Sequence, residues 1–214
     1  MKKSVSLKLI VFSFLLVATS ISYSAPVFQA GTGTNSVVAG VNNIATGDRS
    51  SAVGYLNTTS EENSSAMGYN NTASGKDSSA IGNLNSANKE NSSAVGFFNT
   101  ADGVNSSAMG YYNETKGMSS TAVGVENKAN AENSSAIGYN NKANAENSLA
   151  VGVNNKASED YSSAVGFSNT VSGNSSSTFG VENIVTGNYS TAVGYKNKVS
   201  SNCSYAFGND NTIN

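Results

Sequence analysis

A strict fourteen-residue period constrains the fold of this chain more than any other feature of its sequence. Glycine recurs at this interval thirteen times, always with a serine four residues before it and an asparagine three residues after it. A globular enzyme has no reason to keep such a register, whereas a stack of similar coils does, because every coil repeats the same turns. The phased glycines are Gly40, Gly54, Gly68, Gly82, Gly96, Gly110, Gly124, Gly138, Gly152, Gly166, Gly180, Gly194 and Gly208. The asparagines are Asn43, Asn57, Asn71, Asn85, Asn99, Asn113, Asn127, Asn141, Asn155, Asn169, Asn183, Asn197 and Asn211.

Each repeat predicts two short strands and two turns. The segment Ser-Ser-Ala-(Val/Ile/Met)-Gly alternates small and large side chains, as expected for a strand with two different faces. A second segment centres on a small or apolar residue five positions after the glycine, such as Ala73 or Val171. Stretches such as Asn42-Asn43 and Asp102-Gly103 suit turns, because Gly and Asn tolerate positive φ. The sequence therefore predicts an all-β, narrow parallel β-solenoid, a rod about 55–60 Å long at the usual strand spacing.

A coil this narrow encloses little apolar surface. Only 38% of the chain is hydrophobic, and burial must offset about 1–2 kcal/mol of backbone entropy per residue. The residue before the glycine is large and apolar in nearly every repeat, from Val53 to Phe207, whereas the residue two before it is usually Ala. Adjacent strand positions face opposite ways, so one row faces the interior and the other faces outward. The sequence leaves open which row is which, but either assignment favours self-association.

The N-terminus has the features of a Sec-type signal peptide. Lys2, Lys3 and Lys8 precede an apolar run, residues 9–18, and small residues follow it. We predict a signal peptide over residues 1–24, a lead-in over residues 25–34 and repeats over residues 35–214. The protein is then exported, either to a bacterial cell surface or outer membrane or into the medium.

Composition argues against several function classes. Without the signal peptide, nine basic residues stand against fourteen acidic ones, with no basic cluster in the sequence, so nucleic acid is not an expected partner. The chain has no His, which excludes His-based zinc sites and Ser-His triads. Cys203 is a lone cysteine, and the acidic pairs Glu61-Glu62 and Glu159-Asp160 fall in predicted turns. We expect no enzymatic activity, no metal and no cofactor.

The side chains of two rows, the asparagine row and the row that follows the phased glycine, suggest specific roles. Stacked asparagines predict an amide ladder along the rod, so we assign the Asn and Gly rows a structural role. The residue after the phased glycine is aromatic in seven repeats, and this row has two open interpretations. It packs coils or chains together, or it exposes aromatic rings that bind an extended ligand. These candidate ligand-binding residues are Tyr55, Tyr69, Phe97, Tyr111, Tyr139, Phe167 and Tyr195.

The repeat motifs resemble those of a known family. Segments such as Asn63-Ser-Ser-Ala-Met-Gly68, followed by Asn71-Thr-Ala-Ser-Gly75, are similar to the Asn-Ser-Val-Ala-Ile-Gly head repeats of YadA-type trimeric autotransporter adhesins. The resemblance covers roughly residues 35–214. It implies a left-handed parallel β-roll, a homotrimer, and adhesion to host matrix proteins such as collagen or to cell surfaces.

The chain departs from the family pattern in two ways. The third motif position, usually Val in the family, is usually Ser here. The sequence also contains no heptad pattern and no terminal set of alternating membrane strands, so we expect a head without its own stalk or anchor. A non-enzymatic adhesin head is the leading function. A structural or ice-binding solenoid is the alternative, and a solenoid carbohydrate-active enzyme is disfavoured by the absence of a carboxylate constellation.

Overall fold

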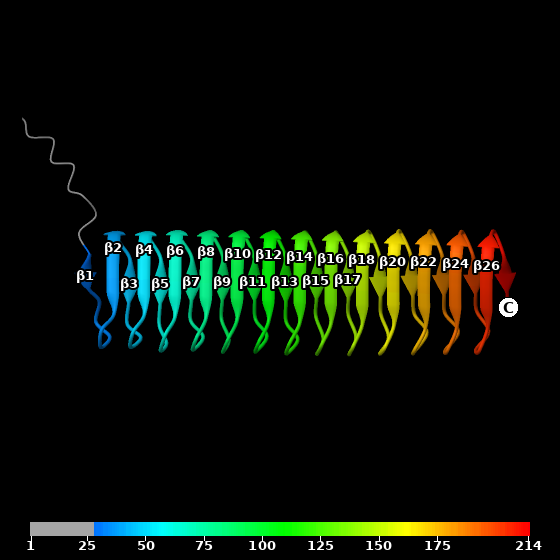
Figure 1. Cartoon of the computed structure of the whole chain (residues 1–214), viewed down its shortest axis with the longest axis horizontal. Helices are drawn as coiled ribbons and strands as arrows, with labels where there is room; N and C mark the ends of the chain where they lie inside the picture. Colours follow the sequence, from blue (N-terminus) through cyan, green and yellow to red (C-terminus); the bar gives the residue numbers. More distant parts are fainter. Residues whose placement is uncertain (1–27) are drawn as a thin grey trace, which may run out of the picture.

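The protein is a rod of stacked β coils (Figure 1). The computed structural model describes residues 28–214, so the predicted signal peptide, residues 1–24, lies outside the described residues. Within them all regular structure is strand, and each coil adds one strand to each of two parallel sheets. The prediction of an all-β parallel solenoid with a fourteen-residue coil is confirmed. Residues 28–214 include no helix long and apolar enough to cross a membrane.

One sheet consists of five-residue strands and is called the long-strand sheet here. Its strands pair in parallel at an offset of fourteen residues, so that Gly96 of one strand is level with Gly82 and Gly110 of its neighbours. They are β2 (Val37–Val41), β4 (Ser51–Tyr55), β6 (Ser65–Tyr69), β8 (Ser79–Asn83), β10 (Ser93–Phe97), β12 (Ser107–Tyr111), β14 (Thr121–Val125), β16 (Ser135–Tyr139), β18 (Leu149–Val153), β20 (Ser163–Phe167), β22 (Ser177–Val181), β24 (Thr191–Tyr195) and β26 (Tyr205–Asn209).

The opposite sheet consists of two-residue strands and is called the short-strand sheet. These strands are β3 (Ile44–Ala45), β5 (Thr58–Thr59), β7 (Thr72–Ala73), β9 (Ser86–Ala87), β11 (Thr100–Ala101), β13 (Glu114–Thr115), β15 (Lys128–Ala129), β17 (Lys142–Ala143), β19 (Lys156–Ala157), β21 (Thr170–Val171), β23 (Ile184–Val185), β25 (Lys198–Val199) and β27 (Thr212–Ile213). At the N-terminal end, β1 (Gln29–Ala30), which lies in the expected lead-in, pairs antiparallel with β2 and covers the edge of the long-strand sheet.

The core between the two sheets is thin, because each sheet contributes one row of small side chains to it. The alanine row of the long-strand sheet faces inward, as at Ala80 and Ala94, and meets the small residues of the short-strand sheet, such as Ala87 and Ala101. The largest fully buried side chains are valines and asparagines. The structure thus decides the question that the sequence left open: the alanine row is internal, and the large apolar row before each glycine faces outward.

Buried asparagines form a continuous ladder beside this core. The amide nitrogen of Asn127 donates to Oδ1 of Asn113 at 3.0 Å and to the carbonyl oxygens of Val123 and Gly138 at 3.0 and 2.7 Å. The phased glycine is required next to it: Gly138 has φ of 119°, and a Cβ there would lie 2.1 Å from the carbonyl oxygen of Gly152. Glycine and asparagine therefore recur together because one backbone conformation and one side-chain network serve every coil.

Candidate functional site

The outer face of the long-strand sheet carries the large apolar row. Met67 is 51% exposed and Phe179 is 47% exposed, although both are apolar. The serines that replace the valine of the related motif share this face and are half-buried, as at Ser65 and Ser107. A continuous apolar strip on a thin single rod is a surface that favours contact with another chain.

The seven candidate aromatic residues all end long strands and are exposed. Their exposed fractions range from 39% at Tyr195 to 47% at Tyr69, Tyr111 and Tyr139. The structure brings two pairs together: Tyr55 stacks on Tyr69, and Phe97 stacks on Tyr111, with 5.5 Å between ring centroids in each pair. Tyr139, Phe167 and Tyr195 stand apart, because Val153 and Val181 occupy the same row in the coils between them.

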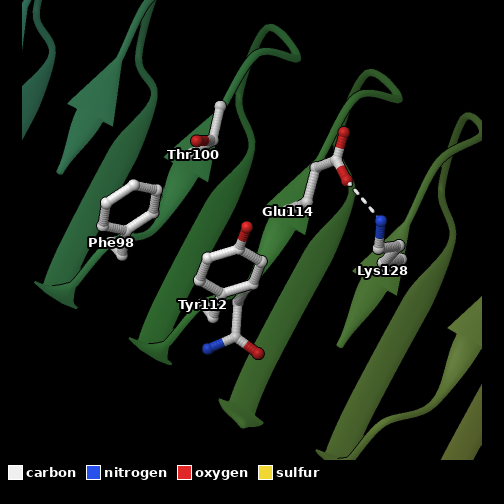
Figure 2. A pocket seen from close by; sticks show the side chains of 6 residues that line it. Phe98, Thr100, Tyr112, Glu114 and Lys128 are labelled. Carbon is white, nitrogen blue, oxygen red and sulfur yellow. Dashed lines mark ion pairs between the residues drawn. The ribbon is translucent and has the colours of Figure 1, made fainter. Parts of the chain in front are cut away.

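A third aromatic pair, which sequence reasoning missed, lies beside Phe97 and Tyr111. Phe98 and Tyr112 follow β10 and β12 directly, and their rings stack at 5.2 Å between centroids. Phe98 also contacts Phe97, and Tyr112 contacts Tyr111, both in tilted arrangements. The four rings therefore form one cluster. Figure 2 shows Phe98 and Tyr112 on successive coils beside a hollow of about 230 Å³, which Thr100, Asn113, Glu114 and Lys128 also line.

The backbone at Phe98 and Tyr112 has an unusual conformation for large residues. Their φ angles are 57° and 56°, in the left-handed region that Asn and Gly tolerate best. Asn70 and Asn140 occupy the same turn position in other coils. This conformation belongs to the repeat, because Leu56, Leu84 and Lys196 have a similar positive φ at the same turn position. Two adjacent aromatic residues in each of two successive repeats, Phe97-Phe98 and Tyr111-Tyr112, were the signal in the sequence that would have located this site.

Glu114 supplies a carboxylate to the lining of the hollow. It pairs with Lys116 on its own coil and with Lys128 on the next, where Nζ lies 3.2 Å from Oε2. Partial burial acts to raise the pKa of Glu114, but hydrogen bonds and attraction from the two lysines outweigh it and hold the pKa below its ordinary value. Glu114 is therefore a fixed negative charge between two positive ones.

Lysines that are far apart in the sequence form a column on the short-strand sheet. Lys128, Lys142 and Lys156 are direct neighbours in the parallel register of β15, β17 and β19. Neither Lys142 nor Lys156 forms an ion pair with any other residue among 28–214. The expectation that the chain lacks a basic cluster was wrong, because a fourteen-residue spacing in sequence becomes one strand spacing in the solenoid.

The remaining candidate chemical groups are scattered. Cys203 is an exposed free thiol, and Glu62 pairs with Arg49 and Lys76 across neighbouring turns. Within residues 28–214 the acidic and cysteine side chains form no group of three placed to hold a metal ion.

Comparison with protein families identifies the repeat. The model of the YadA head domain repeat, in its two-copy form, matches residues 32–57, 60–85, 87–113, 116–141, 143–169 and 170–201. The chain belongs to the YadA head repeat family. A search of curated proteins found no match. The family is one of adhesins, and this YadA head has the repetitive β-roll architecture that the resemblance implied.

The aromatic cluster and the lysine column are local departures from the regular YadA head repeat. They occupy positions that vary from coil to coil, whereas the Gly, Ser and Asn rows are constant. The Ser and Asn rows are buried except at the ends of the rod, and the phased glycines, which are half-buried or exposed, complete each coil. The variable positions lie on its surface, where they distinguish one stretch of the head from another.

Proposed function

We propose that this chain is a non-enzymatic adhesin head that engages an extended fibrous ligand outside the cell. It is exported through its Sec signal to a bacterial surface or secreted, and it binds collagen-like matrix proteins or host cell surfaces. The observation that carries the proposal is the exposed aromatic row, which presents similar rings at the same position of seven coils. Aromatic side chains supply large contact areas at a low entropic cost.

Assembly as a homotrimer is part of this proposal. The outward apolar row, with Met67, Met109 and Phe179 among its most exposed members, is the surface that we assign to contact between chains. Three parallel rods would multiply the aromatic sites. A fibrous ligand that engages several sites at once gains about 10² to 10⁴ in avidity without a new kind of contact.

The proposal is tested by replacing aromatic residues of this row with valine, which other coils have at the same position. Val153 and Val181 already occupy this position, so the triple variant Tyr139→Val, Phe167→Val and Tyr195→Val retains a residue type that the strand accepts. We expect it to stay folded and to lose attachment to immobilised collagen and to cell monolayers. The control variant Asn133→Gly and Asn147→Gly changes only turn positions with positive φ.

Each outcome of this experiment has a clear meaning. Loss of attachment by the valine variant, with the control unaffected and circular dichroism unchanged, supports the adhesive row. Normal attachment by a folded valine variant excludes Tyr139, Phe167 and Tyr195 from the adhesive surface. A variant that unfolds or dissociates supports the packing interpretation of the row. Failure of the unsubstituted protein to bind any matrix protein or cell favours the structural solenoid.

A further inference from the structure

We propose that the short-strand side of the rod carries a binding site for a linear acidic polysaccharide. Phe98 and Tyr112 hold a sugar ring at the hollow, and Lys128, Lys142 and Lys156 hold the anionic groups of the following sugars. This site consists of other residues than the exposed aromatic row that we assign to the fibrous ligand. A single chain contains the whole site. The inference therefore stands independently of the proposed adhesive row and of trimer assembly.

The lysine column presents evenly spaced positive charges, which suit a ligand with regularly spaced negative charges. Its three side chains project from successive parallel strands, which lie about 4.8 Å apart, so the positive charges are evenly spaced along the rod. Like charges directly opposite each other destabilise a sheet. Only Lys128 has a carboxylate partner, Glu114, whereas Lys142 and Lys156 are exposed and unpaired among the described residues. A polyanion along the column removes this repulsion.

The surroundings of the column favour a thin polymer. Each lysine is followed four residues later by an acidic turn residue, and these residues are Glu132, Glu146 and Asp160. The positive strip is therefore narrow, with a parallel negative strip in the adjoining turns. A single polysaccharide chain fits within such a strip, whereas duplex DNA presents phosphates over a width that would also meet the acidic turns.

The aromatic end of the site supplies contacts for a sugar. The stacked rings of Phe98 and Tyr112 border the hollow, and Thr100, Asn113 and Glu114 add polar atoms around it. Apolar surface with a few polar groups is the usual make-up of a small-molecule site, and it suits a sugar ring, which has apolar C–H faces and hydroxyl edges. Lys128 lines the hollow and also begins the lysine column, so the two parts are continuous.

Two sets of variants test the site, and each introduces a residue that the chain already has at the equivalent position of another coil. Thr170 follows Lys156 in the register of the short-strand sheet, so Lys128→Thr, Lys142→Thr and Lys156→Thr form a compatible triple variant. A control with the same loss of charge replaces three exposed lysines outside this row, through Lys76→Thr, Lys89→Thr and Lys196→Asn. For the aromatic end, Phe98→Asn and Tyr112→Asn install the residue found at Asn70 and Asn140.

Binding of the purified exported chain to heparin oligosaccharides, hyaluronan, neutral dextran and single-stranded DNA is measured by calorimetry at several salt concentrations. We expect heparin or hyaluronan to bind, dextran not to bind, and the column variant to lose affinity by roughly tenfold or more with a shallower salt dependence. The control should bind like the unsubstituted chain, and the aromatic variant should bind more weakly. Sulfated heparin and carboxylated hyaluronan distinguish which anionic group is preferred.

Several results would overturn the proposal. These are failure of both acidic polysaccharides to bind, equal losses in the column variant and its control, or tighter binding of single-stranded DNA. Unchanged affinity in the aromatic variant would overturn the assignment of a sugar to the hollow. The aromatic variant should be at least as stable as the unsubstituted chain, because asparagine relieves the strained turns, so misfolding does not obscure the result.

Discussion

At the scale of single residues, the buried asparagines connect the coils through their side chains. Each amide donates to the coil before it and to carbonyl oxygens of its own and the next coil, and its Oδ1 accepts from the coil after it. Buried polar groups are tolerated only when they are hydrogen-bonded, and here the repeat satisfies every interior rung in the same way. The constant spacing of this residue follows from the network, because a shift by one position would break it.

Replacement of one interior rung should destabilise the protein severely. Asn127→Ala removes the donor to Gly138 and Val123 and the acceptor of Asn141, and leaves these groups buried without that partner. We expect a loss on the order of 3 kcal/mol or more in the free energy of unfolding, measured by denaturant titration. Asn133→Gly, at an exposed turn position with φ of 54°, is the control and should change stability little. Equal effects would disprove the role of the ladder.

A buried hydroxyl without a hydrogen-bond partner predicts a substitution that raises the stability of the protein. Thr178 replaces the internal alanine of its coil, and its Oγ1 is buried without a hydrogen bond. Thr178→Val keeps the shape and should stabilise the protein by about 1 kcal/mol. In Thr115 the hydroxyl donates to Oγ of Ser106 at 3.0 Å, so Thr115→Val should be neutral or destabilising. Thermal unfolding of the two variants compares them directly, and a stabilised Thr115→Val would contradict this explanation.

At the scale of strands and turns, the sequence predicted the elements better than it predicted the surface. The constant rows indicated two strands and two turns per coil, because each coil repeats the same backbone. The inward row could not be assigned from alternation alone, since it depends on how thin the core is. In the structure, buried alanines of the long-strand sheet pack with Ala87 and Ala101 of the short-strand sheet. The Phe98–Tyr112 pair and the lysine column were missed, because their members are adjacent only after the coils stack.

The ion pairs of Glu114 link β13 to β15 and predict a pH dependence of stability. Because the pKa of Glu114 is lowered in the folded protein, its contribution is fully present above the unfolded pKa and is lost as pH falls through the folded pKa. Glu114→Gln should therefore unfold at a lower temperature than the unsubstituted chain at neutral pH. This difference should shrink as the pH falls below the ordinary glutamate pKa of about 4.3, and it should vanish below the folded pKa of Glu114.

Glu132→Gln is the matched control for this measurement. Glu132 is exposed and forms no ion pair with the residues that the structure describes. The control should unfold at nearly the same temperature as the unsubstituted chain across the whole range. A gap between Glu114→Gln and the unsubstituted chain that persists in acid would show that the effect is not caused by ionisation.

At the scale of the whole molecule, the rod gains stability from repetition and not from a thick core. Each coil contacts only its two neighbours along the stack, so the stability of such an array is approximately a sum of coil and interface terms. Its interior contains no fully buried side chain larger than valine or asparagine among the described residues. The largest apolar side chains are therefore on the outside, and burial between rods is the remaining source of apolar stabilisation.

The proposed trimer can be tested by placing charge on the outward apolar row. Met67→Glu and Met109→Glu alter side chains that are 51% and 47% exposed in the single rod, so the coil itself should tolerate them. Across a contact between chains they would bury carboxylates without partners, which is strongly unfavourable. We expect sedimentation equilibrium to give three times the chain mass for the unsubstituted protein and a single chain mass for the variant. Unfolding of the unsubstituted protein should also depend on its concentration.

The matched control places the same two charges on the short-strand sheet. Thr72→Glu and Ser86→Glu lie in the row that already carries Glu114, so this sheet accepts the residue type. The control should remain trimeric, because the proposed contact uses the other face. Dissociation of both variants would mean that added charge, and not its place, weakens assembly. If the double variant Met67→Glu and Met109→Glu stays trimeric, the outward apolar row is excluded from the contact between chains.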